Sequence, residues 1–262
     1  MDPIRVFIGT EIKTRVAEKV LIHSIKSRTT RLVEFTPMIG PGWEYPIDGI
    51  KVGTGFSLRR WMIPAACGFK GYAIYLDADQ IVLGDIAELW DTGRALMPSV
   101  DRDERVVACT FQRDKSYPNR DAPQTSVMVV NCELVDGCWQ FDISKILQWL
   151  KDNPGPERYA HFMHAQDLRV AALPTEWNHL NVYQEGKTKL LHYTSESSQP
   201  WYKPDHPLAY LWKKELSAAL KAGAVTRADL EEALAMWGKK ADWRPTNGLH
   251  PAYMKWLKEA IK

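Results

Sequence analysis

Hydrophobic residues along the chain form short, β-branched runs that alternate with stretches of helical spacing. The apolar runs predict strands, most of them buried, at residues 4–10, 33–35, 72–76, 81–83, 106–111 and 127–130. The helical spacing predicts helices at residues 15–27, 56–66, 85–90 and 143–151, with Pro64 kinking or ending the second of them. Strands that alternate with helices predict an α/β fold whose sheet is at least partly parallel.

The pattern changes after Pro204, where strands are no longer expected. Helical spacing continues at residues 208–222, 227–237 and 253–261, and Thr226 is a suitable cap for the middle helix, with Asp229 in its first turn. We therefore expect a sheet domain over 1–203 and a helical C-terminal extension over 204–262.

Composition narrows the class of protein. In 262 residues, Lys and Arg number 34 and Asp and Glu number 32, a balance that argues against a nucleic-acid partner bound by phosphate neutralisation. We expect no transmembrane segment, because no stretch approaches the roughly 20 apolar residues needed to cross a bilayer. The N-terminal residues do not show the pattern of a signal peptide. The four cysteines are scattered and predicted to be reduced thiols, so a cytoplasmic location is expected. The 11 tryptophans fit either a heavy core or stacking on hydroxylated ligands.

The clearest chemical feature is a pair of carboxylates, Asp77 and Asp79, directly after the apolar run 72–76. In extended backbone, residues two apart point to the same side, so both carboxylates can converge beyond the end of the strand. Ligands bind at this place in open α/β sheets. Two hard oxygen donors suit Mg²⁺ or Mn²⁺, which commonly bridges to substrate phosphates.

The segment around these carboxylates resembles the retaining glycosyltransferases of family 8. Tyr-Leu-Asp-Ala-Asp at 75–79 is followed by an apolar run and Gly-Asp at 84–85, as in that family. Other segments agree in order and spacing over about residues 4–203: residues 56–64, 126–131, 166–178 and 192–201.

The resemblance implies a GT-A fold, a nucleotide-sugar-binding sheet that is mixed and mainly parallel and is flanked by helices. Asp77 and Asp79 match the family's metal carboxylates and His192 its third protein ligand. An imidazole beside two carboxylates shifts the preference from Mg²⁺ towards Mn²⁺. Gln166 matches the residue beside the reacting sugar carbon, and Asp167 after it is expected to hydrogen-bond the sugar hydroxyls.

The implied donor is a UDP-sugar, with UDP-glucose or UDP-galactose expected first. Its expected contacts are Thr10, Arg60, Gln124, Lys203 and Asp77, with Arg59 as the alternative to Arg60. The acceptor is a hydroxyl compound of unknown kind: a glycan, a lipid or a small molecule. The sequence predicts no oligomeric state.

The chain departs from the family pattern at donor positions. Gln124 starts a Gln-Thr-Ser segment where the family has Asn-Ser-Gly, and Ala165 stands where the family often has Asp. Gln199 replaces a Lys that would meet the β-phosphate, and Lys203 is expected to compensate. At the N-terminal edge, Thr10 and Glu11 replace the acidic pair that usually meets uridine.

The residue types also suggest a mechanism. Gln166 is a poor nucleophile, whereas retention in a hydrolase normally uses a carboxylate, so we expect same-face attack in which the leaving phosphate oxygen accepts the acceptor's proton. Two rival functions stay open: a nucleotidylyltransferase of similar topology, and a non-catalytic carbohydrate-binding protein. The first would need a Gly-rich, basic loop after the first strand, and the second would not need Asp77, Asp79 and His192 together.

Overall fold

The computed structural model describes residues 2–46, 54, 56–97, 106–113, 119–154, 169–194, 199–201 and 205–238. Within this part the chain forms two compact units, each assembled from three segments. The first unit contains residues 1–10, 31–77 and 87–177, and the second contains residues 11–30, 78–86 and 178–262. The expected division at residue 203 stays a prediction.

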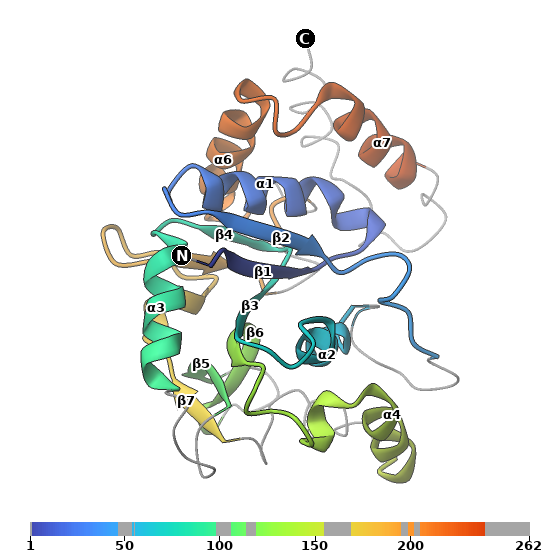
Figure 1. The fold of residues 1–262 in the computed structure, drawn as a ribbon. Coiled ribbons are helices and arrows are strands. Elements are labelled where there is room, and N and C mark those ends of the chain that lie inside the picture. Colours follow the sequence, from blue (N-terminus) through green and yellow to red (C-terminus); the bar gives the residue numbers. More distant parts are fainter. Residues whose placement is uncertain are drawn as a thin grey trace. The chain divides into compact units, whose positions relative to one another are not determined.

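The first unit is built on a six-stranded sheet in the order β2-β1-β3-β6-β5-β7 (Figure 1). Its strands are β1 (Ile4–Gly9), β2 (Val33–Pro37), β3 (Tyr72–Asp77), β5 (Val107–Gln112), β6 (Ala122–Asn131) and β7 (Val170–Ala172). The pairs β1–β2, β1–β3 and β5–β7 are parallel, while β6 runs antiparallel to both of its neighbours. The mixed, mainly parallel sheet is therefore confirmed, with β6 as the reversed strand.

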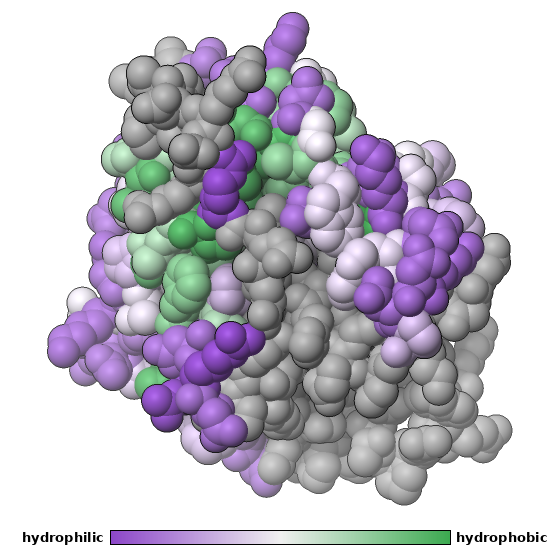
Figure 2. Space-filling view, turned by 90° about the horizontal axis from the view of Figure 1, so that it is seen from below, coloured by the Kyte–Doolittle hydropathy of each residue, from purple (hydrophilic) through white to green (hydrophobic). Residues whose placement is uncertain are grey.

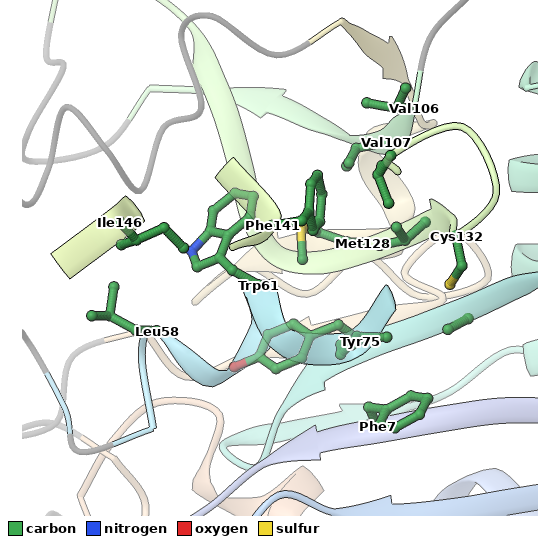
Figure 3. Packing of buried hydrophobic residues seen from close by; sticks show 14 of the residues in the cluster. Phe7, Leu58, Trp61, Tyr75, Val106, Val107, Met128, Cys132, Phe141 and Ile146 are labelled. Carbon is green, nitrogen blue, oxygen red and sulfur yellow. The ribbon is translucent and has the colours of Figure 1, made fainter. Parts of the chain in front are cut away.

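Alternating side chains of this sheet face two different sets of helices. Tyr75 and Met128 point into a core shared with Trp61 and Phe141, whose rings meet edge to face at 5.4 Å (Figure 3). On the opposite face, α3 (Ile86–Leu96) packs so closely that a Cβ on Gly93 would collide with Val129. Each face thus has its own close packing, as expected for a sheet covered by helices on both sides.

The predicted helix over 56–66 is replaced by two shorter elements. The chain forms the 3₁₀ helix η2 (Arg59–Met62) and then α2 (Ile63–Ala66), with Pro64 in the first turn of α2. Proline has no N–H and its ring clashes with the carbonyl four residues earlier, so one continuous α-helix cannot run through this position. The described residues also form η3 (Trp139–Phe141), α4 (Ile143–Asp152) and η4 (Thr175–Asn178), the last of which ends where the first unit ends. The carboxylate of Asp142 caps α4.

The described part of the second unit combines a small sheet with helices. The sheet has the order β4-β9-β8, formed by β4 (Gln80–Val82), β9 (Leu190–His192) and β8 (His179–Leu180). It also holds η1 (Ile12–Thr14), α1 (Arg15–Lys26), α6 (Ala209–Lys221) and α7 (Arg227–Gly238), and α6 and α7 both pack against α1 (Figure 1). The helices expected at 208–222 and 227–237 are present, and the one expected at 253–261 lies outside the described residues.

Ion pairs and a second apolar core hold these helices together. Arg28 pairs with Glu215 at 2.5 Å, and Lys19 pairs with Asp229 at 2.6 Å. Asp229 also accepts hydrogen bonds from the backbone and hydroxyl of Thr226, which confirms the expected cap of α7. The rings of Trp201 and Trp212 lie 5.1 Å apart in the core, so both residues are accounted for by packing.

Some apolar side chains are exposed at the surface of the protein. On the face shown in Figure 2, an area of hydrophobic residues has hydrophilic residues beside it. Of the large apolar residues that the structure describes, these are more than a third exposed: Ile12, Leu32, Phe69, Val182 and Tyr210. They come from both units, and scattered exposure of this kind is normal for a folded protein.

The four cysteines are free thiols, as predicted. Burial raises the pKa of Cys109 to about 12, so this thiol is protonated and inert at neutral pH. No described helix combines the length and apolar character that crossing a bilayer would require.

Candidate metal centre

The chain carries its two predicted carboxylates across the end of β3. Asp77 is the last residue of this strand, and Asp79 immediately precedes β4, whose Gln80 is paired with His192 in the antiparallel β4–β9 ladder. The backbone N–H of Tyr193 also donates to the carbonyl of Asp79 at 3.1 Å. The β4–β9 pairing therefore fixes Asp79 beside His192, although 113 residues separate them in the sequence.

The side chains of Asp79 and His192 lie next to each other, with Oδ1 of the aspartate close to Nε2 of the histidine. The distance from His192 Nε2 to Asp79 Oδ1 is 3.2 Å, and both side chains are largely buried. Asp79 Oδ1 is shielded from solvent and takes part in no hydrogen bond of the described residues. A buried carboxylate oxygen without a donor is costly, so this atom is suited to a cation.

Asp77 joins this pair through the chain. It is separated from Asp79 by Ala78 alone, so two peptide units bound its distance from that residue. Among the described residues, Asp77, Asp79 and His192 form a group in which each offers one ligand atom within 4.8 Å of the others. Two carboxylates and one imidazole are a fitting donor set for a divalent metal with mixed oxygen and nitrogen ligands.

Asp77 has close polar partners within the first unit. Arg60 Nη2 donates to Asp77 Oδ1 at 3.1 Å, and the hydroxyl of Tyr75 donates to the same oxygen. Arg60 is itself held by Thr125 Oγ1 at 3.0 Å, and its guanidinium lies 4.5 Å from the centre of the Tyr75 ring. The arginine predicted to contact the donor thus contacts Asp77, the first of the candidate metal ligands.

The two arginines that the sequence left as alternatives are held differently. Arg59 Nη1 donates to the backbone carbonyls of Met38 at 2.5 Å and Thr10 at 3.2 Å. Arg60 is buried and paired with Asp77 as described above. Arg59 therefore supports the loops after β1 and β2, while Arg60 belongs to the surroundings of Asp77.

The other predicted donor residues lie at the same edge of the first unit's sheet or outside the described residues. Thr10 is buried directly after β1, where Gly9 is in register with Asp77. Gln124 is buried in β6, and its amide contacts the carbonyls of Gln112 and Ala122 at 3.3 and 3.4 Å. Gln166, Asp167 and Lys203 lie outside the described residues, so their roles stay predictions.

Two residues that the sequence did not assign to the site touch the metal candidates. Asn178 Oδ1 lies 3.1 Å from His192 Nδ1, and Gln199 Nε2 donates to Asp79 Oδ2 at 2.7 Å. Both belong to family-like segments, which is the signal that could have drawn attention to them. Gln199 had been interpreted as a lost phosphate contact, whereas here its amide contacts a metal-candidate carboxylate.

The first unit also contains a separate, mainly apolar pocket of about 630 Å³. Trp43 and Met62 line it together with Phe69 and Phe141, and Lys145 is among its polar residues. The predicted site residues are not part of this lining.

Comparison with known proteins agrees with this description of the fold. The chain superposes on the galactosyltransferase LgtC with a TM-score of 0.57 and 11% identity, covering 82% of this chain and 96% of LgtC. The glycosyltransferase GlyE of Streptococcus pneumoniae TIGR4 gives a TM-score of 0.60 and 15% identity, over 96% of this chain and 66% of GlyE. The chain has the GT-A glycosyltransferase fold.

Two further comparisons set the scale of this similarity. The bifunctional glycosyltransferase WbbM gives a TM-score of 0.55 and 13% identity, and this chain spans about half of it, 51%. The curated Protein CDI of Arabidopsis thaliana is 27% identical over 242 residues, which are 82% of this chain and 86% of that protein. No family model matches the chain. At identities this low, the superpositions show the fold alone. The reaction has to be argued from the residues of the site.

Proposed function

We propose that the chain is a metal-dependent, retaining glycosyltransferase, similar to family 8, that moves a hexose from a UDP-sugar to a hydroxyl acceptor. The observation that carries the proposal is the group of Asp77, Asp79 and His192, whose ligand atoms lie within 4.8 Å of one another. Asp79 Oδ1 in this group is buried without a hydrogen-bond donor among the described residues and lies 3.2 Å from His192 Nε2, an arrangement that suits a bound cation.

The proposal distinguishes residues that would bind the metal from one residue that supports them. Asp77, Asp79 and His192 would hold the cation, for which Mn²⁺ is proposed first and Mg²⁺ as the alternative. When bound, the cation supplies Lewis-acid stabilisation of the departing diphosphate. Arg60 orients the carboxylate of Asp77 and offsets its charge, because its buried guanidinium is 3.1 Å from that carboxylate.

The sugar end of the site rests on residues that the sequence alone suggests. Gln166 would lie beside the reacting carbon and Asp167 would hydrogen-bond the sugar hydroxyls. Thr10, Gln124 and Lys203 would contact the nucleotide-sugar. Because a glutamine amide is a poor nucleophile, we propose same-face attack, with the leaving phosphate oxygen accepting the proton of the acceptor. Gln166→Ala should consequently cost less rate than loss of the metal site.

A thermal-shift panel tests the donor and the metal together. UDP-, GDP- and ADP-sugars are each added with and without Mn²⁺, and a ligand that binds the folded state raises the melting temperature according to its concentration over its dissociation constant. We expect UDP-glucose or UDP-galactose to give the largest shift, and only with Mn²⁺ present. The absence of a shift with any UDP-sugar plus Mn²⁺ would overturn the donor assignment.

Matched variants and products separate the rival functions. Asp79→Ala should remove the Mn²⁺-dependent shift, whereas Asp205→Ala, which changes an exposed carboxylate of the second unit, should keep it. Release of pyrophosphate from UTP plus a sugar 1-phosphate would support a nucleotidylyltransferase instead. Glycan binding that is indifferent to Mn²⁺ and to Asp79→Ala would support a carbohydrate-binding protein.

A further inference from the structure

Gln199 is a buried amide whose two ends have different surroundings. Its side chain is 4% exposed. Nε2 donates to Asp79 Oδ2 at 2.7 Å and to the carbonyl of Tyr193 at 3.3 Å. Its Oε1 is buried and accepts no hydrogen bond from the described residues. The amide therefore holds one oxygen of the Asp79 carboxylate and leaves the other, Oδ1, facing His192.

Asn178 holds the imidazole of His192 in a corresponding way. Asn178 is fully buried, and its Oδ1 lies 3.1 Å from His192 Nδ1. Because an amide oxygen can only accept, the proton of this contact belongs to Nδ1 of the imidazole. In a neutral imidazole Nε2 is then the unprotonated nitrogen, which is the form of the ring atom that binds a metal. The backbone supports the arrangement, since His192 pairs with Leu180 in the β8–β9 ladder.

We propose that Gln199 and Asn178 are positioning residues that select which atoms of Asp79 and His192 bind the metal. The inference rests on the proposed function, because it concerns the same metal, and it extends that function to two residues outside the metal-binding group. All four side chains belong to the second unit, and the contacts that join them are given above. Partners of this kind orient the ligands and raise metal affinity.

The neutral charge of Gln199 is part of the proposal. A lysine at this position, as in the family pattern, would place a cation where the amide now meets Asp79. Such a charge would compete with the metal for the same carboxylate. We therefore infer that Gln199 serves the metal centre of this protein and is not a weakened phosphate contact.

Direct Mn²⁺ binding in the absence of nucleotide tests the inference. Free Mn²⁺ is measured from its electron paramagnetic resonance signal during titration of the wild type, Gln199→Met, Gln199→Lys and Asn178→Leu. We expect Gln199→Met and Asn178→Leu each to raise the dissociation constant for Mn²⁺ by about tenfold or more, the usual effect of losing such a partner. Gln199→Lys should weaken Mn²⁺ binding at least as much as Gln199→Met.

Controls distinguish positioning from a general effect on the fold. Gln184→Met changes an exposed glutamine of the same unit and should bind Mn²⁺ like the wild type. Melting in EDTA reports folding without the metal, and a merely structural role would lower this melting temperature while leaving the Mn²⁺ dissociation constant unchanged. If one glutamine variant fails to fold, the other and Asn178→Leu still carry the test.

The outcomes also separate this inference from the proposed function. If the wild type binds Mn²⁺, Asp79→Ala does not, and the Gln199 and Asn178 variants stay within twofold of the wild type, the positioning role is wrong and the metal centre stands. If Gln199→Lys improves UDP-sugar binding without weakening Mn²⁺ alone, Gln199 occupies a phosphate contact instead. If the wild type binds no Mn²⁺, the metal centre itself is wrong, and the positioning role falls with it.

Discussion

The surroundings of Asp77 and Asp79 differ more than their spacing suggests. Asp77, in the first unit, receives a buried guanidinium from Arg60 and a hydroxyl from Tyr75. Asp79, in the second unit, receives the neutral amide of Gln199 and faces the imidazole of His192. Asp77 thus has a permanently charged arginine as its partner, whereas the contacts of Asp79 come from a neutral amide and from an imidazole whose charge depends on its protonation. Removing Arg60 and removing the Asp79 charge should consequently have opposite effects on the metal-free protein.

The largest effect is expected from Arg60→Met, which keeps much of the side-chain volume but leaves Asp77 without its cation. Breaking one partner out of a buried ion pair typically costs about 3 kcal/mol or more. Urea denaturation in EDTA measures the change in the free energy of unfolding. Wild-type stability in Arg60→Met would show that the guanidinium does not compensate the charge of Asp77.

Asp79→Asn should separate stability from activity. Transfer of the sugar should fall by about a hundredfold or more, the usual scale for losing an electrostatic stabiliser. In EDTA, however, the variant should be no less stable than the wild type, because it removes a buried carboxylate whose Oδ1 has no hydrogen-bond donor among the described residues. Initial rates with Mn²⁺ and melting curves without it measure the two effects. A clear loss of stability in EDTA would mean that Asp79 is already compensated in the metal-free protein.

Gly9→Ala tests the support of Asp77 from behind. A Cβ at this position would collide with the hydroxyl of Tyr75, the group that donates to Asp77. Overpacking of this kind costs about 2 kcal/mol and would push the hydroxyl away from the carboxylate. Ala108→Gly, also in a strand of the first unit, is a control for a change of the same size elsewhere. A melting temperature within one degree or so of the wild type would contradict the close packing around Tyr75.

The smallest effect is expected far from both carboxylates, at Asp229→Asn. Partial burial pushes the pKa of Asp229 upward, but the hydrogen bonds from Lys19 and Thr226 outweigh it and hold the pKa below its usual value. A lowered pKa stabilises the fold above the unfolded-state value of about 4 and loses this contribution as the pH falls through the folded-state pKa. The variant should therefore be about 1 kcal/mol less stable at pH 6, and the difference should vanish near pH 2. Thermal unfolding at the two pH values measures it, and a difference that persists at pH 2 would contradict the assignment.

Local patterns in the sequence predicted many of the individual elements. The apolar run before Asp77 is β3, and the helical spacing after residue 14 is α1 (Arg15–Lys26). The short strands β7, β8 and β9 were not predicted, because a segment of two or three residues is too short to show the alternation that marks a strand. The prediction of one continuous helix over 56–66 was wrong, because Pro64 prevents an α-helix from continuing through this position.

The amino-acid sequence alone predicts which side chains could bind a metal. Asp77 and Asp79 follow a buried strand at a spacing that lets both reach one point, and the resemblance added His192 as a third ligand. The contacts that hold each candidate ligand in place depend on the tertiary structure. Gln199 and Asp79 are 120 residues apart, and Arg60 and Thr125 are 65 residues apart. Such partners meet only because strands distant in the sequence are paired, and no local pattern encodes which side chains that pairing brings together.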